Sequence, residues 1–256
     1  MNYYNEFEPQ AAAWLRELIA EGLIPAGVVD TRSIEDVHPS DLAGFTQCHF
    51  FAGIGGWPYA LALAGWPADR PVWTGSCPCQ PFSKAGKGAG FDDQRHLWPA
   101  WFHLIRQCRP PTVFGEQVAT AIKHGWLDTV ACDMEGAGYA LASAVLRGAS
   151  VGAPHDRRRL FFVANTLSQG VARPLVSIAS GLPGSWGWRG EADLRVISED
   201  PFKPGDRWPE PLFRSLDDGL PARVGRLRGY GNAIVPQAAA EFIRAAEESR
   251  VMRDAA

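Results

Sequence analysis

The residues with the clearest chemical potential lie in the stretch GSCPCQPFS, residues 75–83, where one proline separates Cys77 from Cys79. Such a pair could be half of a zinc site, part of a disulfide, or a nucleophile displayed on a turn. A zinc site usually needs a second close pair, and only Cys48 and His49 offer one. The five cysteines are odd in number, which argues against complete pairing. We therefore expect no metal here and no disulfide.

Three other segments carry groups that could take part in a reaction. Glu116 lies near the end of the apolar run PTVFGEQV, and a carboxyl group at the dry end of a strand can deliver or accept a proton. The segment GAPHDRRR supplies three consecutive arginines, which alone would be typical of a solvated turn. The segment FAGIGG is a glycine loop after an apolar run, a pattern that also fits many ordinary turns.

Apolar periodicity and turn residues predict the elements that position these groups. We expect strands at NYYNEF, AGVVDTRSI, FTQCHF, RPVWTGS, PTVFGEQV, YALASAVL and LFFVAN. We expect helices at 9–22, 57–65 and 97–108, a helical or irregular stretch at 119–137, and a last helix that begins at Pro236. This alternation favours an α/β, doubly wound, Rossmann-like sheet, in which ligands bind beyond the carboxyl ends of the strands. Cys48, Cys108 and Cys132 fall in apolar or helical segments and are predicted to be buried structural thiols.

Length and composition fit one main domain with a small appendage. The chain has 256 residues, of which 46% are hydrophobic and 21% charged. No apolar run approaches the roughly 18 residues that a membrane helix needs, and the start MNYYNEFEP lacks the features of a signal peptide. We therefore expect a cytoplasmic protein without membrane contact. The net charge of −3 gives no general attraction to nucleic acid, so any such binding would depend on a local basic groove.

Taken together, five segments resemble the motifs of the DNA cytosine-5 methyltransferases in that family's order: FAGIGG, GSCPCQPFS, VFGEQV, GAPHDRRRLFFVA and GYGNAIVPQ. The resemblance covers residues 45–165 and 223–243. It implies the S-adenosylmethionine-dependent methyltransferase fold, S-adenosyl-L-methionine as cofactor and double-stranded DNA as partner. It also implies methyl transfer to carbon 5 of a cytosine that has been flipped out of the duplex.

The resemblance assigns roles around the base. Cys79 would add as a thiolate to carbon 6 of cytosine, and Glu116 would protonate or hydrogen-bond N3. Arg159 would donate to O2, with Arg157 supporting the site or a phosphate. The loop 84–91, rich in glycine and lysine, would close over the DNA.

The chain departs from the family's pattern at three positions. Gln117 stands where the family usually has asparagine, His155 stands where it usually has glutamine, and Cys77 stands where it often has proline or a small residue. The acid is retained, the role of His155 stays open, and we interpret Cys77 as structural.

A cofactor loop of this kind normally meets an acidic residue about 20 residues later, at the end of the next strand. Here the next strand carries Cys79, so we place the missing half at the N-terminus, in a permuted order of motifs. By resemblance Glu6 would bind the ribose, Phe7 would pack on the adenine, and Asp30 would accept from the adenine amino group. The other implied cofactor contacts are Phe51, Gly53, Ile54, Gly55, Pro78 and Asn232. The alternative is an N-terminal strand and helix without a ligand.

Residues 166–222 alternate proline, glycine and tryptophan without a sustained period. We interpret them as a small target-recognition insert in a catalytic domain made of residues 1–165 and 223–256. Four residues there could contact DNA: Trp186, Trp188, Arg189 and Arg207. The insert's size favours a short or relaxed target sequence, and the compact chain would suit a restriction-modification or phage enzyme acting as a monomer.

Three other functions are considered. The first is an inactive relative that binds DNA, the second is an enzyme that uses the Cys79 addition to transfer another group, and a distant third is a small-molecule enzyme on a Rossmann fold.

Overall fold

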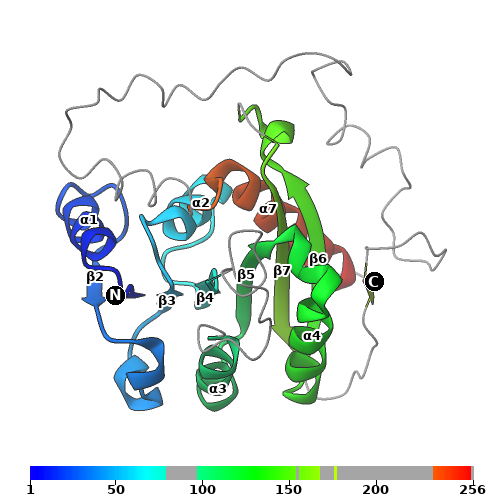
Figure 1. Ribbon diagram of the computed structural model, residues 1–256, viewed down its shortest axis with the longest axis horizontal. Coiled ribbons are helices and arrows are strands. Elements are labelled where there is room, and N and C mark those ends of the chain that lie inside the picture. Colours follow the sequence, from blue (N-terminus) through cyan, green and yellow to red (C-terminus); the bar gives the residue numbers. More distant parts are fainter. Residues whose placement is uncertain (79–96, 154–155, 168–175, 178–232, 255–256) are drawn as a thin grey trace.

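The computed structural model describes residues 1–78, 97–153, 156–167, 176–177 and 233–254 (Figure 1). The strands are β1 Asn2–Asn5, β2 Gly27–Asp30, β3 Gln47–Phe50, β4 Val72–Gly75, β5 Thr112–Val118, β6 Tyr139–Arg147, β7 Arg158–Thr166 and β8 Val176–Ser177. The α-helices are α1 Pro9–Ala20, α2 Gly56–Ala64, α3 Trp98–Cys108, α4 Trp126–Gly136 and α7 Pro236–Asp254. Short 3-10 helices are η1 Ile34–Asp36, η2 Pro39–Leu42, η4 Ala119–His124 and η5 Gly148–Val151. The predicted strands and helices are confirmed, with boundaries shifted by a few residues.

The strands form one sheet in the order β2-β1-β3-β4-β5-β7-β6-β8. Strands β2, β1, β3, β4 and β5 pair in parallel, whereas β7 runs antiparallel to both β5 and β6. The first strand of the chain therefore lies between β2 and β3, directly beside the strand that leads into the glycine loop. A mixed α/β sheet of this kind fits the predicted fold class, although the antiparallel direction of β7 was not predicted.

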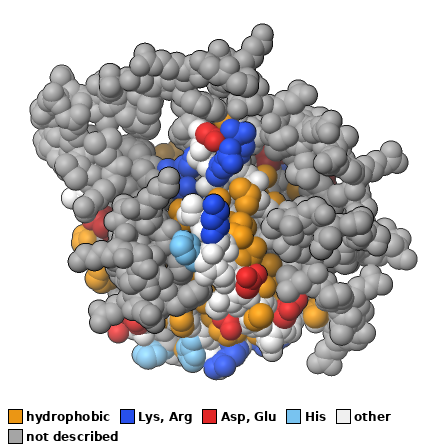
Figure 2. Space-filling model, turned by 45° about the vertical axis from the view of Figure 1, so that its right-hand side comes forward, with side chains coloured by type: hydrophobic (Ala, Val, Ile, Leu, Met, Phe, Trp, Pro, Cys, Tyr) orange, Lys and Arg blue, Asp and Glu red, His pale blue; other side chains and the backbone are white. Residues whose placement is uncertain are grey.

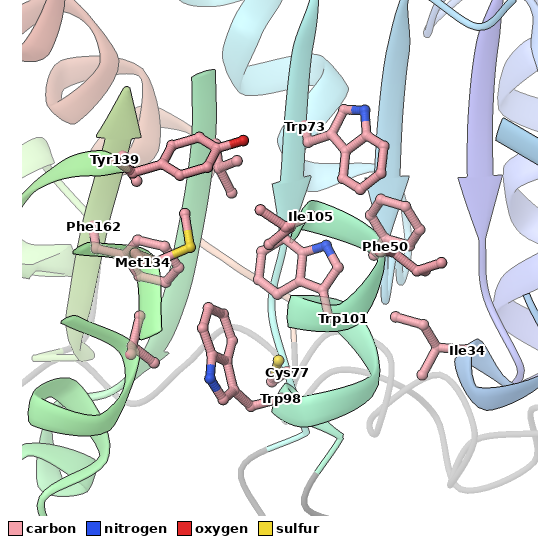
Figure 3. Packing of buried hydrophobic residues seen from close by; sticks show 14 of the residues in the cluster. Ile34, Phe50, Trp73, Cys77, Trp98, Trp101, Ile105, Met134, Tyr139 and Phe162 are labelled. Atoms are coloured by element: carbon pink, nitrogen blue, oxygen red, sulfur yellow. The ribbon is translucent and has the colours of Figure 1, made fainter. Parts of the chain in front are cut away.

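Helices cover both faces of the sheet (Figure 1). Helices α3 and α4 bury tryptophans and aliphatic side chains against one face, and Figure 3 shows Trp98, Trp101 and Phe162 in this cluster. Helices α2 and α7 pack on the other face over β4, β5 and β7, and α1 packs there beside β1. Because both faces are covered, the central strands read as continuous apolar runs rather than as alternating ones.

Two glycines let the α3 side of the core approach the middle of the sheet. Gly75 in β4 pairs with Gly115 in β5. A Cβ atom at Gly75 would lie 2.6 Å from the Trp101 ring, and one at Gly115 would lie 2.1 Å from the Phe162 ring. The glycines thus make room for two large rings beneath the strand ends that carry the reactive residues.

The prediction that Cys132 is a buried thiol is wrong, because its side chain is exposed on α4. The helix turns Leu127, Val130 and Met134 toward the core, and position 132 falls on the opposite side of that stripe. Cys48 is buried as predicted, and burial raises the pKa of its thiol to about 12. Cys108 is only half-buried.

Most of the predicted insert lies outside the described residues, as do the loop 84–91 and the four residues expected to contact DNA. The described part of the insert includes β8, which pairs in parallel with β6 at the edge of the sheet. None of the described helices is both long and apolar enough to cross a lipid bilayer.

Candidate active site

The predicted site residues that the structure describes gather at one edge of the sheet, beyond or near the carboxyl ends of its parallel strands. Glu6 follows β1, Asp30 ends β2, and Phe51 follows β3. Pro78 lies just after β4, and Glu116 lies near the end of β5. Because β7 is antiparallel to β5, its first residues, including Arg159, meet the same edge.

The N-terminal unit is joined to the glycine loop by the side chain of Glu6. One carboxylate oxygen of Glu6 accepts from the Gly53 backbone N–H at 2.7 Å, and the other accepts from the Glu8 N–H at 2.9 Å. Burial raises the pKa of Glu6, while these two backbone hydrogen bonds act in the opposite direction. The predicted neighbours are therefore in direct contact.

The backbone conformation of the glycine loop would let a ligand come close to the main chain. Phe51, Gly53 and Gly55 all have positive φ angles, of 51°, 56° and 81°, and a non-glycine residue in this region is uncommon. A Cβ atom at Gly53 would meet nothing nearer than the Phe51 carbonyl oxygen at 4.0 Å, so the space over this glycine is open. Ile54 is half-buried beside it.

Phe7 and Asp30 differ in how free they are to meet a ligand. The side chain of Phe7 is 70% exposed, although it is a large apolar group next to the buried end of β1. The Asp30 carboxylate already accepts from the Tyr3 hydroxyl at 2.8 Å and pairs with Arg32 at 2.7 Å. Burial disfavours its charge, yet the Arg32 guanidinium keeps the pKa of Asp30 below its usual range.

The end of β4 leads into the cysteine turn. The Cys77 side chain is buried among Trp98, Trp101 and their neighbours (Figure 3), and burial strongly raises the pKa of its thiol. Its contacts fit the predicted structural role and give it little thiolate character. Pro78 is half-buried, and Cys79 lies outside the described residues.

Glu116 is the buried acid of the site. Its side chain is 7% exposed and pairs with Arg159, whose Nε lies 2.6 Å from a Glu116 oxygen. The pairing register places Val118 opposite Arg159, so Glu116, Arg159 and Arg157 lie along one face of the sheet. Burial raises the pKa of Glu116, and the two arginines only partly offset that effect.

Gln117 points to the opposite face from Glu116 and has its own role in the turn. Its side chain is 1% exposed, donates to the Cys77 carbonyl at 3.5 Å and accepts from the Val118 N–H at 2.9 Å. The residue that replaces the family's usual asparagine thus contacts the backbone two residues before Cys79. Two hydrogen-bonding residues of this region, Ser76 and Trp57, were not predicted, because a lone serine or tryptophan gives no pattern.

The basic surface beyond the strands is formed partly by the hairpin of β6 and β7. At its tip Asp156 pairs with Arg158 at 3.2 Å and also pairs with Arg147. Figure 2 shows Lys and Arg side chains gathered toward the upper end of the described surface. His155 and Asn232 lie outside the described residues, so their predicted places stay predictions.

Comparison with known proteins finds one family model and several methyltransferases that resemble part of the chain. Residues 66–179 match the family model described as C-5 cytosine-specific DNA methylase. Over this segment the chain is similar to that family. It is 28% identical over 144 residues to the type II methyltransferase M1.ScrFI of Lactococcus lactis subsp. cremoris. The aligned segment makes up 54% of this chain and 37% of that protein. The chain is also 33% identical over 136 residues to the type II methyltransferase M.MspI of Moraxella sp, and this aligned segment makes up 50% of this chain and 32% of that protein.

The chain thus spans about a third of the length of these curated relatives. Among solved structures, DNMT2 of Spodoptera frugiperda aligns with a TM-score of 0.45 at 16% identity, over 73% of this chain and 48% of that one. The family match contains Glu116 and Arg159 but begins after the glycine loop.

Proposed function

We propose that the protein transfers a methyl group from S-adenosyl-L-methionine to carbon 5 of a flipped cytosine in double-stranded DNA. One observation carries this proposal. Glu6 with the glycine loop, and Glu116 with Arg159, lie at the same edge of the sheet. A ligand held at the first pair and a base held at the second would lie on the two sides of β4, beyond the carboxyl ends of the parallel strands, where ligands of α/β sheets bind.

On the base side, this chain's residues supply an acid, a cation and a nucleophile. The Cys79 sulfur would form a bond to carbon 6 as a proton from Glu116 reaches N3. The raised pKa of Glu116 favours this role, because its carboxyl takes up a proton at a higher pH than an exposed glutamate. Carbon 5 would then form its bond to the methyl group. Loss of the carbon 5 proton to a base such as water would restore the double bond to carbon 6 and release the Cys79 thiolate, and the N3 proton would return to Glu116. Arg159 would hold Glu116 and face O2.

On the cofactor side, the described residues fit S-adenosyl-L-methionine. The exposed ring of Phe7 offers a face for an adenine, Glu6 offers carboxylate oxygens for ribose hydroxyls, and Gly53 leaves open space at the loop. The cofactor supplies an electrophilic methyl group to the reaction. Pro78 and Asn232 complete the proposed set, and Asp30 would have to serve the adenine while it remains paired with Arg32.

The order of these parts along the chain supports a permuted arrangement. Strands β1 and β2 precede the glycine loop in sequence but lie beside its strand in the sheet. A parallel ladder depends on neighbouring strand directions, and chain order affects only the connections. We propose that residues 3–34 form the cofactor half that other members would carry after the loop.

Methyl transfer is tested with DNA and methyl-labelled cofactor, and covalent addition with a duplex that contains 5-fluorocytosine. We expect label in the DNA and a stable protein–DNA complex, and Cys79→Ser should abolish both while cofactor binding persists. Neither label nor complex would favour an inactive DNA-binding relative. A complex without label would favour transfer of another group.

The N-terminal cofactor half is tested by cofactor affinity. Glu6→Ala should weaken binding by about 10- to 100-fold, the effect of losing hydrogen bonds to a charged group. Glu17→Ala, on the exposed side of α1, is the matched control and should leave affinity unchanged. Equal affinity for wild type and Glu6→Ala would contradict the permuted site.

A further inference from the structure

Ser76 stands between two polar groups that belong to different parts of the site. The Trp57 indole Nε1–H donates to the Ser76 hydroxyl oxygen at 3.0 Å. The same hydroxyl forms a side-chain hydrogen bond with the Glu116 carboxylate. Trp57 is the second residue of α2, directly after the glycine loop, and its side chain is 2% exposed. A short chain of hydrogen bonds therefore runs from that helix to the acid.

The chemistry of the three groups fixes the direction of this chain. An indole N–H can only donate a hydrogen bond, and an ionised carboxylate can only accept one. The Ser76 hydroxyl must therefore accept from Trp57 and turn its own proton toward Glu116. Such linked hydrogen bonds strengthen one another in a dry site.

We infer that Ser76 is a positioning residue, whose hydroxyl, oriented by Trp57, holds the Glu116 carboxylate in place for its work on the base. The inference rests on the proposed function for that role of Glu116. It extends that function by tying the acid to the helix that follows the cofactor loop.

The other groups that face Glu116 make the contribution of Ser76 measurable. Arg159 and Arg157 approach from β7, and the buried Cys77 thiol lies on the β4 side. Burial raises the pKa of Glu116, whereas the arginines and the Ser76 hydrogen bond lower it. Loss of the hydroxyl removes a bond to the charged form, so the pKa should rise further.

The test titrates Glu116 directly, by NMR of carboxyl-labelled protein, in wild type and Ser76→Ala. We expect the midpoint to rise by about one pH unit in Ser76→Ala, the effect of one hydrogen bond to a charged group. Ser76→Thr, which keeps a hydroxyl, should restore the wild-type midpoint. Trp57→Phe should raise it in the same direction, and should add nothing in the Ser76→Ala background.

Thr74→Val is the matched control. Thr74 lies in β4, two residues before Ser76, and its hydroxyl contacts His49 at 2.8 Å. This variant should leave the Glu116 midpoint unchanged. An unchanged midpoint in Ser76→Ala, or an equal rise in Thr74→Val, would overturn the inference. If Ser76→Ala does not fold, Trp57→Phe decides by the same readout.

Methyl-transfer kinetics separate this inference from the proposed function. In Ser76→Ala the fall of kcat at alkaline pH should move up with the Glu116 midpoint, with little change in KM for DNA. A wild type that transfers no methyl group would refute the proposed function, while the titration would still decide whether Ser76 acts on Glu116.

Discussion

His49 should make the fold sensitive to mild acid. It lies in β3, two residues before Phe51, and its ring is fully buried. The ring stacks on Tyr4 at 5.1 Å, and Nδ1 lies 2.8 Å from the Thr74 hydroxyl. Among the described residues, Nε2 has no hydrogen-bond partner. Burial lowers the pKa of His49 to about 3, because a charge there would be poorly solvated.

The sign and size of the effect follow from linkage between folding and protonation. In the unfolded chain the histidine titrates near its ordinary pKa of 6.5. Below that pH, and down to the pKa of about 3 in the folded state, the unfolded state therefore binds one more proton than the folded state. The free energy of unfolding then falls by about 1.4 kcal/mol per pH unit. Between pH 7 and pH 5 this amounts to about 2 kcal/mol, a large share of the stability of a typical domain.

The measurement is urea unfolding, followed by tryptophan fluorescence, at several pH values between 7 and 5. His49→Phe keeps a ring against Tyr4 but cannot be protonated, so its loss of stability over this range should be about 2 kcal/mol smaller than that of wild type. His103→Gln removes an exposed histidine of α3 and should follow wild type. Equal losses in wild type and His49→Phe would refute the reasoning.

Two further predictions concern packing and an ion pair. Gly115→Ala should destabilise the fold by about 1–3 kcal/mol, because the added Cβ would overlap the Phe162 ring. Gly136→Ala places its Cβ in open space and should be neutral or stabilising. Midpoints of urea unfolding test both variants. Arg70→Ala should cost about 1 kcal/mol at pH 7, since Arg70, which lies between α2 and β4, pairs with Glu247 of α7. Burial disfavours the Glu247 charge, but Arg70 lowers the Glu247 pKa, so this difference should be present above about pH 5 and vanish as the pH falls through that pKa.

Much of the sheet could be predicted because its segments carry unambiguous local signals. Buried parallel strands are short apolar runs, and glycines mark the turns, as at Gly55 and Gly65 around α2. The place of β1 beside β3 followed from chemistry, because the glycine loop lacked an acid on the strand after it. The structure has these two strands as neighbours, while the roles of Glu6 and Asp30 toward a cofactor stay proposals.

Other features depend on tertiary contacts that no local pattern encodes. The direction of β7 is set by its pairing with β5 and β6, and an apolar run such as LFFVAN fits either direction. The pairing of Asp30 with Arg32 and Tyr3 required knowing which side chains share the edge beyond β1 and β2. The hydrogen bond that gives Ser76 its importance joins residues 19 positions apart. Ser76 lies in the stretch GSCPCQPFS, but nothing in that stretch indicates a contact with Trp57.

Glu6 would have two roles, one toward the cofactor and one toward the loop backbone, and its variants must separate them. It would hold the cofactor, and it also fixes the Gly53 backbone through the 2.7 Å hydrogen bond. Glu6→Ala removes both, so weaker binding could come from a relaxed loop alone. Glu6→Gln keeps an oxygen that can accept from Gly53 but loses the charge. If the carboxylate contacts the ligand directly, Glu6→Gln should also weaken binding, whereas near wild-type affinity in Glu6→Gln would assign Glu6 to the loop rather than to the cofactor.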